Sequence, residues 1–172
     1  MNIILKNFVI IISPIFYHYP QIKKIISNKS DFGFSSDRLA LNYCSIFIEI
    51  ILNLSSNKNN LVFFNQNNRL PFLIIDMIGN ILKFAVINKY SISKSKIKKN
   101  INFIFLYSLF NLTILLPLAL ITNLALFNII LSFVSFVFSF IGIIPQIKEI
   151  VKLKKSGSLS YVSTILEYFG NW

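Results

Sequence analysis

Apolar residues occur in long runs along this chain, separated by short basic or Asn-rich segments. Residues 101–146 contain no Lys, Arg, Asp or Glu. At about 1.5 Å per residue they make about 69 Å of helix, about twice the hydrocarbon thickness of a bilayer. This run therefore predicts two membrane spans, at 101–120 and 123–145, with a turn at Thr122 and Asn123 because polar pairs interrupt apolar helices.

Three shorter apolar runs precede this stretch, at Ile3–Tyr19, Leu39–Leu54 and Leu70–Ile87, and each predicts a further span. The first run also has the length and hydrophobicity of a signal peptide, but no small-residue cleavage site follows it. Residues 158–172 begin another apolar segment of about 22 Å as a helix, which is short for a crossing. We therefore expect five complete spans and a partial sixth.

Basic residues lie in alternate loops between these predicted spans. Such an alternation is typical of the cytosolic loops of multi-spanning proteins, so it predicts a luminal or external N-terminus. The loop after the second span, residues 55–69, holds only Lys58 and Arg69, and the turn after the fourth holds no charge. The basic loops follow the first, third and fifth spans, with Lys23, Lys24, Lys29, Lys89, Lys94, Lys96, Lys98, Lys99, Lys148, Lys152, Lys154 and Lys155.

The composition excludes most other classes of protein. Hydrophobic residues make up 55% of the chain and charged residues 13%, whereas soluble domains carry about 25% charge. The basic residues that give the net charge of +11 lie between apolar spans. This placement favours an anionic membrane leaflet over a nucleic acid as the partner of these residues. A single cysteine, Cys44, and a single histidine, His18, argue against disulfides, metal centres and hydrolase triads. We expect no enzyme activity, catalytic residue, metal or cofactor.

An internal repeat is the most informative pattern. Pro20-Gln21 and Pro145-Gln146 occupy corresponding span ends, each followed by a short basic loop and a Gly/Ser-rich segment. A shift of 125 residues, 145 − 20, superimposes the two copies. The same shift also pairs Ser35 with Ser160, Leu41 with Leu166 and Tyr43 with Tyr168. Two copies on the same predicted side of the membrane indicate a duplicated helical unit.

With these motifs the chain resembles the PQ-loop proteins, the group of the SWEET sugar transporters, cystinosin and the KDEL receptors. The resemblance implies an all-α, polytopic membrane bundle in which two parallel three-helix bundles are joined by a linker helix. It divides the chain into a first bundle at 1–90, a basic loop and linker span at 91–122, and a second repeat at 123–172. We expect the second bundle to be incomplete in this sequence, so that a closed cavity would need a partner copy in a homo-oligomer or more C-terminal sequence.

Within that group the chain is similar to the mannose-P-dolichol utilisation defect 1 family. The matching positions after the first Pro-Gln are Lys29-Ser30, Gly33-Phe34-Ser35 and Leu41-Asn42, where Asn42 replaces an acidic residue. The resemblance implies an endoplasmic-reticulum membrane protein needed for the use of dolichol-phosphate-linked mannose and glucose. A small-solute transporter of sugars or amino acids, and a sorting receptor or scaffold without transport, remain alternatives.

The two prolines and glutamines are the first candidate functional residues. Proline removes an intrahelical hydrogen bond, so Pro20 and Pro145 are candidate hinges, or else mark the ends of their helices. Gln21 and Gln146 can bind carbonyls that the prolines leave unpaired, or are ordinary interfacial polar residues. His18, beside the first motif, is expected to be solvated at the membrane interface.

Polar residues inside the predicted spans are the second set, because burying such groups in lipid is costly. Asp76, Asn80 and Lys83 are spaced i, i+4 and i+7, which places them on one helical face. They line a candidate substrate cavity with Glu49, which is also a possible partner of Asp76 or Lys83, or else form a structural seam between helices. Asn42 and Glu167, related by the repeat, are a weaker pair of candidates.

Overall fold

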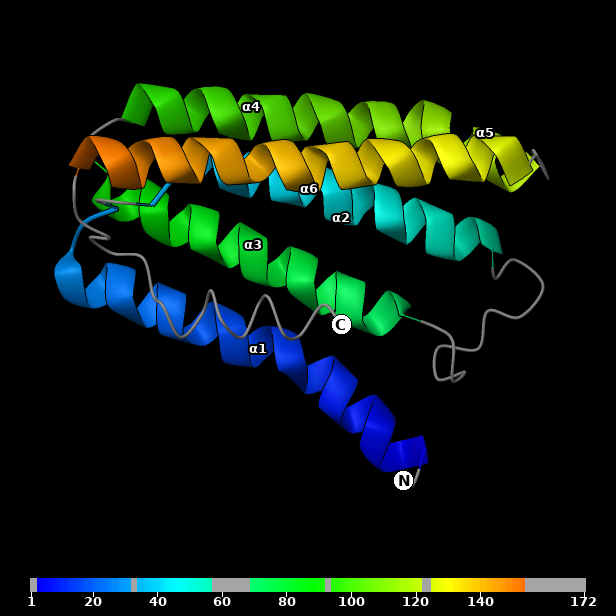
Figure 1. The fold of residues 1–172 in the computed structure, drawn as a ribbon, viewed down its shortest axis with the longest axis horizontal. Helices are drawn as coiled ribbons and strands as arrows, with labels where there is room; N and C mark the ends of the chain where they lie inside the picture. The colour runs from blue at the N-terminus through cyan, green and yellow to red at the C-terminus, as the bar shows by residue number, and fades with distance from the viewer. Residues whose placement is uncertain (1–2, 32–33, 57–68, 92–93, 122–124, 154–172) are drawn as a thin grey trace.

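A computed structural model describes residues 3–31, 34–56, 69–91, 94–121 and 125–153, and within these ranges every regular element is helical. The helices are α1 (Ile3–Asn28), α2 (Ser36–Ser56), α3 (Leu70–Tyr90), α4 (Lys94–Phe110), the π-helical turn η1 (Asn111–Leu115), α5 (Leu116–Ile121) and α6 (Ala125–Leu153). Figure 1 shows them side by side along one long axis. This confirms the prediction of an all-α helical bundle.

Four helical stretches are long and apolar enough to cross a membrane, and they match the second to fifth predicted spans. These stretches are Ser36–Ser56, Leu70–Tyr90, Lys94–Ile121 and Leu126–Lys152. The first predicted span lies within α1, whereas the partial sixth span and Glu167 lie outside the described residues. The helices extend beyond the apolar runs because Lys and polar residues continue them into the membrane interface. The chain is therefore a multi-pass membrane protein.

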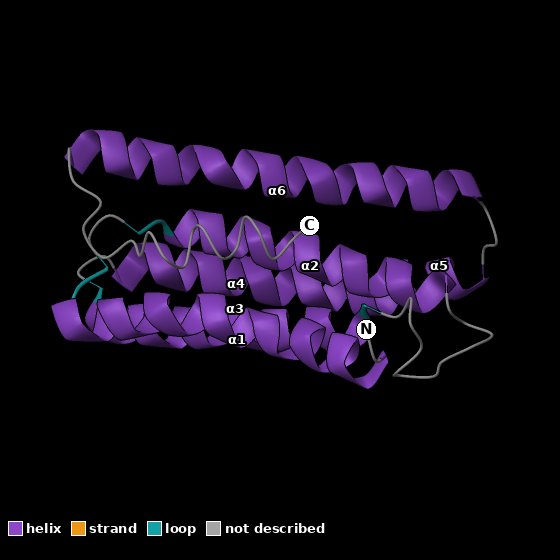
Figure 2. Ribbon diagram, turned by 60° about the horizontal axis from the view of Figure 1, so that its bottom comes forward, coloured by secondary structure: helices purple, strands orange, loops and turns teal. Residues whose placement is uncertain are grey.

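The order of the helices in space differs from their order in the chain. α1 packs mainly against α3, and α3 packs against α2, so that α3 lies between α1 and α2 in the bundle (Figure 1). α2 also contacts α4, α5 and α6, which makes it the central helix of the described chain. Figure 2 shows α6 running along one side of the bundle, opposite α1. We call the end where α1 and α3 finish and α2 and α4 begin the basic end.

The π-helical turn explains how the fourth predicted span continues past a proline. Pro117 has no N–H to donate to the carbonyl of Thr113. The chain widens over Asn111–Leu115, and the N–H of Leu116 donates to the carbonyl of Asn111. The helix then continues to Ile121, and α6 begins at Ala125, so the predicted turn at Thr122 and Asn123 lies outside the described residues.

The prolines of the two Pro-Gln motifs lie inside helices. α1 contains Pro14 and Pro20 and continues to Asn28, and α6 contains Pro145 and continues to Leu153. The interpretation of these prolines as helix ends is therefore wrong, because in each helix the residues after the proline resume the helical hydrogen bonds. Figure 1 shows that α1 bends along its length and diverges from α3 towards its N-terminus.

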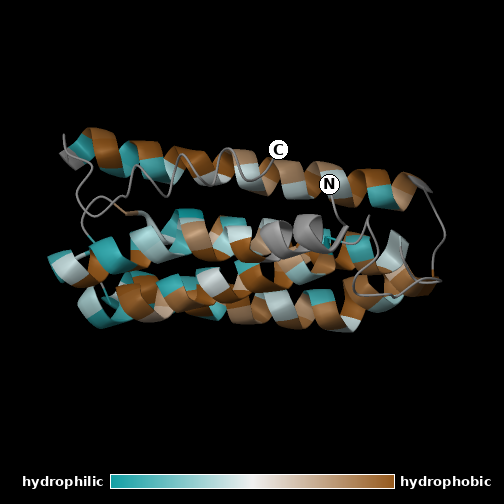
Figure 3. Cartoon of the chain, turned by 90° about the horizontal axis from the view of Figure 1, so that it is seen from below, coloured by the Kyte–Doolittle hydropathy of each residue, from teal (hydrophilic) through white to brown (hydrophobic). Residues whose placement is uncertain are grey.

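Two apolar clusters hold the described helices together. The cluster at the basic end joins α1, α2, α3 and α4 through Ile25, Phe34, Leu39, Ala40, Phe84, Ile87 and Ile97. The other joins α2, α5 and α6 through Tyr43, Phe47, Ile48, Ile51, Ala119 and Leu131. Many large apolar side chains of α4 and α6 are instead exposed. Figure 3 shows apolar positions, in brown, along the helices. A lipid environment satisfies such surfaces.

Candidate functional site

A histidine and an aspartate meet between α1 and α3. His18 Nε2 lies 2.7 Å from Asp76 Oδ1, and the two residues are only 3% and 7% exposed. Gly79 lies against the imidazole, and a Cβ at that position would collide with the ring. The expectation that His18 is solvated at the interface is therefore wrong, because the side of α1 that carries it packs directly on α3.

Two asparagines extend this pair across α3 to α2. Asn80 is fully buried, and its Nδ2 donates to the backbone carbonyl of Asp76 at 3.0 Å and to Oδ1 of Asp76 at 3.4 Å. Asn42 Nδ2 of α2 donates to Asn80 Oδ1 at 3.3 Å. We call His18, Asp76, Asn80 and Asn42 the polar cluster, and it connects α1, α2 and α3.

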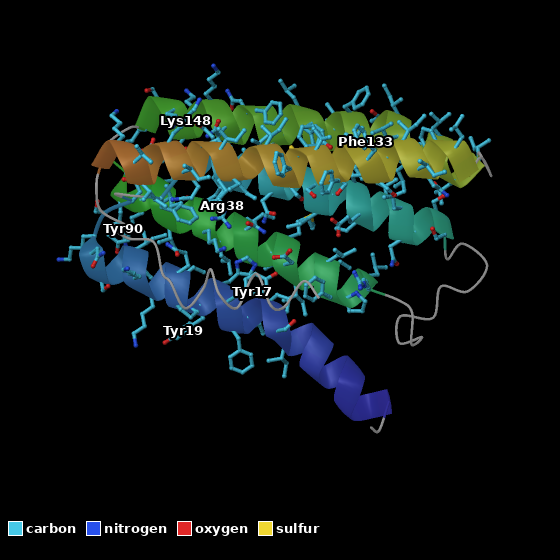
Figure 4. All side chains as sticks on the ribbon, in the orientation of Figure 1. Tyr17, Tyr19, Arg38, Tyr90, Phe133 and Lys148 are labelled. Atoms are coloured by element: carbon cyan, nitrogen blue, oxygen red, sulfur yellow. The ribbon has the colours of Figure 1, made fainter. Side chains whose placement is uncertain are left out.

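A buried lysine lies one turn along α3 from Asn80. Lys83 is 3% exposed, and its Nζ lies 5.9 Å from the ring centroid of Tyr17. The Tyr17 and His18 ring centroids are 4.5 Å apart, with the rings tilted at 49° to each other. Figure 4 shows Tyr17 on the side of α1 that faces α3 and Tyr19 on the opposite side. The cationic ammonium is thus held by an aromatic face beside the polar cluster.

A second polar seam joins α2 to α6. Ser45 Oγ lies 2.8 Å from Ser135 Oγ and 2.6 Å from Ser139 Oγ, and Ser135 Oγ also donates to Glu49 Oε1 at 3.2 Å. Small hydroxylated side chains allow two helices to approach closely in a membrane and to hydrogen-bond across the interface. The exposed Glu49 therefore belongs to the contact with α6, and its described hydrogen bond is with Ser135.

The second Pro-Gln motif contacts the start of α2. Gln146 of α6 is buried, and its Oε1 accepts a hydrogen bond of 3.1 Å from the backbone N–H of Ser35, the residue before α2. Ser35 Oγ in turn accepts from the backbone N–H of Arg38, as a helix N-cap does. The Gln146 side chain therefore accepts a backbone N–H that the start of α2 would otherwise leave unpaired. Gln21 of the first motif is also buried.

The structure brings together several residues that the sequence singled out. Asp76, Asn80 and Lys83 share the buried face of α3, and Asn42 reaches them from α2. Sequence reasoning missed His18, although His18, Gln21 and Ile25 are spaced i, i+3 and i+7 and are all buried on α1. It also missed the polar seam between α2 and α6, which we call the serine seam. Ser135 and Ser139, its two residues in α6, are spaced i, i+4. The roles of Pro20 and Pro145 as hinges remain predictions.

The chemistry of the polar cluster suits recognition of a small polar molecule. Imidazole, amide and carboxylate groups on three helices offer both donors and acceptors, and Lys83 adds an amine. Buried polar groups in a membrane protein are costly and are retained mostly for function or for specific helix packing. Among the described residues no group of three His, Cys, Asp or Glu side chains is arranged to hold a metal ion.

Comparison with known families adds one finding. Residues 127–172 match the PQ loop repeat. This segment contains Pro145 and Gln146, so the second copy of the predicted repeat is confirmed as a PQ-loop repeat. No curated protein and no solved structure matches the chain. The chain is thus a multi-pass membrane protein that carries a PQ-loop repeat in its second half.

Proposed function

We propose that this protein supports the use or the transbilayer handling of dolichol-phosphate-linked mannose and glucose in glycosylation. The proposal includes a non-enzymatic role, residence in the endoplasmic-reticulum membrane and a luminal N-terminus, with a homo-oligomer as a possible assembly. It starts from the resemblance of Lys29-Ser30, Gly33-Phe34-Ser35 and Leu41-Asn42 to the mannose-P-dolichol utilisation defect 1 family. The polar cluster between α1, α2 and α3 is the observation that carries it.

The polar cluster offers hydrogen-bonding groups that match the hydroxyls of a hexose. The Asn42 and Asn80 amides each present a donor and an acceptor, and the Asp76 carboxylate presents two acceptors. Their mutual hydrogen bonds of 3.3 and 3.4 Å are longer than the usual N–H···O range of about 2.7–3.2 Å, which favours their exchange for the hydroxyls of a sugar.

Lys83 favours a ligand that carries a phosphate as well as a sugar. Its ammonium group is buried on the same face of α3 as Asp76 and Asn80. A lysine acts towards phosphate as a compact cation, and its attraction is stronger where water is excluded. A phosphate-linked sugar would satisfy both Lys83 and the amide groups, and its lipid chain would remain among the apolar side chains outside the bundle.

A small-solute transporter of the PQ-loop type is the second candidate. The polar cluster without Lys83 would suit a free sugar or an amino acid equally well, because its amide and carboxylate groups recognise hydroxyls and ammonium groups alike. A sorting receptor or scaffold would require the polar cluster to act only as a seam between helices. The contribution of Lys83 therefore separates these candidates.

Complementation of cells that cannot use dolichol-phosphate-mannose tests the proposal. The chain should restore full-length lipid-linked oligosaccharides, and Asn80→Leu and Lys83→Gln should abolish the rescue at equal protein abundance. Lys98→Gln is the matched control, since it removes one exposed lysine from α4 and should rescue fully. Failure of the unmodified chain to rescue would refute the dolichol role. Rescue that is lost in Asn80→Leu but kept in Lys83→Gln would contradict recognition of the phosphate.

A further inference from the structure

One lysine joins the ends of three helices at the basic end. Lys96 lies in the first turn of α4, and its Nζ lies 3.0 Å from Asp37 Oδ2 of α2 and 3.7 Å from Glu149 Oε1 of α6. The three side chains are between a third and two fifths exposed, so solvent and salt reach them. Such a bridge holds three helices but is weak enough to open.

An asparagine one turn further along α4 strengthens the same connection. Asn100 Nδ2 donates to Asp37 Oδ1 at 2.8 Å and to Ser36 Oγ at 3.1 Å. Both acceptors lie in the first turn of α2. Two residues of α4 therefore hold the start of α2, Lys96 through an ion pair and Asn100 through hydrogen bonds.

α6 holds the start of α2 from the other side. The Gln146 side chain accepts the N–H of Ser35 within the protein interior, one turn from Glu149. Gly142, one further turn back, brings α6 close to α2, since a Cβ there would lie 3.4 Å from the Cβ of Leu41. Polar and apolar contacts between α2 and α6 thus converge at the basic end, where Lys96 of α4 pairs with one acidic residue of each helix.

These contacts lie on the end of the bundle that carries the exposed lysines. Lys148 of α6 lies at this end in Figure 4, as does Tyr90 at the end of α3. Two acidic residues there, Asp37 and Glu149, are engaged by Lys96. Lys96 is therefore distinguished from its neighbour Lys98, which is exposed.

We propose that Asp37, Lys96, Glu149 and Asn100, together with the Gln146–Ser35 hydrogen bond, form a clamp that closes the basic end of the bundle and opens to admit a ligand from that side. The role of the clamp in admitting a ligand rests on the proposed function. The opening of the clamp does not rest on the proposed function, because it can be measured without any ligand. When the clamp opens, α2 separates from α4 and α6 at its first turns.

The single cysteine of the chain is a built-in reporter of this opening. Cys44 lies on α2, about two turns from Asp37, and is completely buried. Its backbone carbonyl accepts a hydrogen bond of 3.3 Å from the hydroxyl of Tyr107 in α4. Separation of α2 from α4 would expose this thiol, and labelling of a buried group follows the population of the open form.

The experiment measures the rate at which N-ethylmaleimide alkylates Cys44 in the full chain in phosphatidylcholine nanodiscs. Lys96→Gln and Gln146→Leu should each raise the rate about tenfold or more, since each removes one side of the clamp. Lys96→Arg should label as slowly as the unmodified chain, because a guanidinium reaches the same carboxylates. Lys98→Gln is the matched control and should also label slowly. In the unmodified chain, 0.5 M NaCl should raise the rate by screening Lys96.

Two outcomes would overturn the clamp. One is a labelling rate in Lys96→Gln equal to that in Lys98→Gln, and the other is faster labelling with a circular-dichroism spectrum that shows loss of helix, since this would report unfolding. Complementation by the same variants separates the clamp from the proposed function. An unmodified chain that fails to rescue refutes the dolichol role and leaves the labelling result standing, whereas unchanged labelling refutes the clamp whatever the rescue.

Discussion

His18 and Asp76 tie the first helix to the third, with His18 Nε2 and Asp76 Oδ1 2.7 Å apart and both residues buried. The contact depends on Gly79, since no larger residue leaves room for the imidazole. Through Asn80 and Asn42 the pair also reaches α2, so that one polar cluster sets the positions of three helices. The same groups are the candidate ligand contacts.

Removal of the imidazole should destabilise the protein. His18→Leu keeps a side chain of similar size but leaves the buried Asp76 without its partner in α1. Leaving a buried polar group without its hydrogen-bond partner costs about 1–3 kcal/mol, so we expect a clear decrease in the free energy of unfolding. Thermal unfolding in detergent measures it, with Tyr19→Phe, at a residue that is 61% exposed, as the control. Equal stability of His18→Leu and the unmodified chain would contradict a structural role for the pair.

A methyl group at Gly79 should be poorly tolerated. In Gly79→Ala the new Cβ would collide with the His18 ring, and overpacking of this kind costs about 1–3 kcal/mol. Gly142→Ala is the matched control, since its Cβ would lie 3.4 Å from the nearest atom, the Leu41 Cβ, and needs little adjustment. Comparison of the two melting temperatures checks the prediction. A larger loss in Gly142→Ala would mean that the ring is not held as described.

The serine seam between α2 and α6 should show direct energetic coupling. Ser45 and Ser135 exchange hydrogen bonds between their hydroxyls and backbone carbonyls. A double-mutant cycle with Ser45→Ala and Ser135→Ala should give a coupling energy of about 0.6–1.7 kcal/mol, the range for polar contacts between membrane helices. The pair Ser45→Ala and Ser95→Ala should be additive, because Ser95 is an exposed residue of α4. Additivity in both pairs would remove the seam as a source of stability.

The two ends of α3 should lie on opposite sides of the membrane. Arg69 precedes α3, and Lys98 lies in the first two turns of α4, beyond the other end of α3. Single cysteines at Arg69 and Lys98, in a Cys44→Ala background, should react with an impermeant maleimide from opposite sides, and Lys98 should be cytosolic. Labelling of both from one side would contradict the span count and the alternation of basic loops.

The prolines of the two Pro-Gln motifs should affect activity more than folding. Pro20→Ala together with Pro145→Ala supplies two backbone donors within α1 and α6, and alanine is favourable in a helix. Membrane insertion and protein abundance should stay unchanged, whereas rescue of lipid-linked oligosaccharides should decrease because the helices lose their points of bending. Full rescue by the double variant at equal abundance would reduce these prolines to structural residues.

The amino-acid sequence alone determined the features that depend on local pattern. Apolar run length predicted the second to fifth spans, because the bilayer sets how much apolar helix a crossing needs. The i, i+4, i+7 spacing placed Asp76, Asn80 and Lys83 on one face of α3, since helical geometry is the same in any context. The repeated Pro-Gln motif indicated the PQ-loop repeat found at residues 127–172.

Only the tertiary structure decided which of these faces meet. Neither the pairing of His18 with Asp76 nor that of Gln146 with Ser35 follows from spacing, because each joins helices that are distant in the chain. Helix order and rotation depend on how side chains of different helices pack, and α3 lies between α1 and α2 against the order of the sequence. An interfacial histidine and a buried one look alike in a single sequence, and what separates them is the neighbouring helix at Gly79.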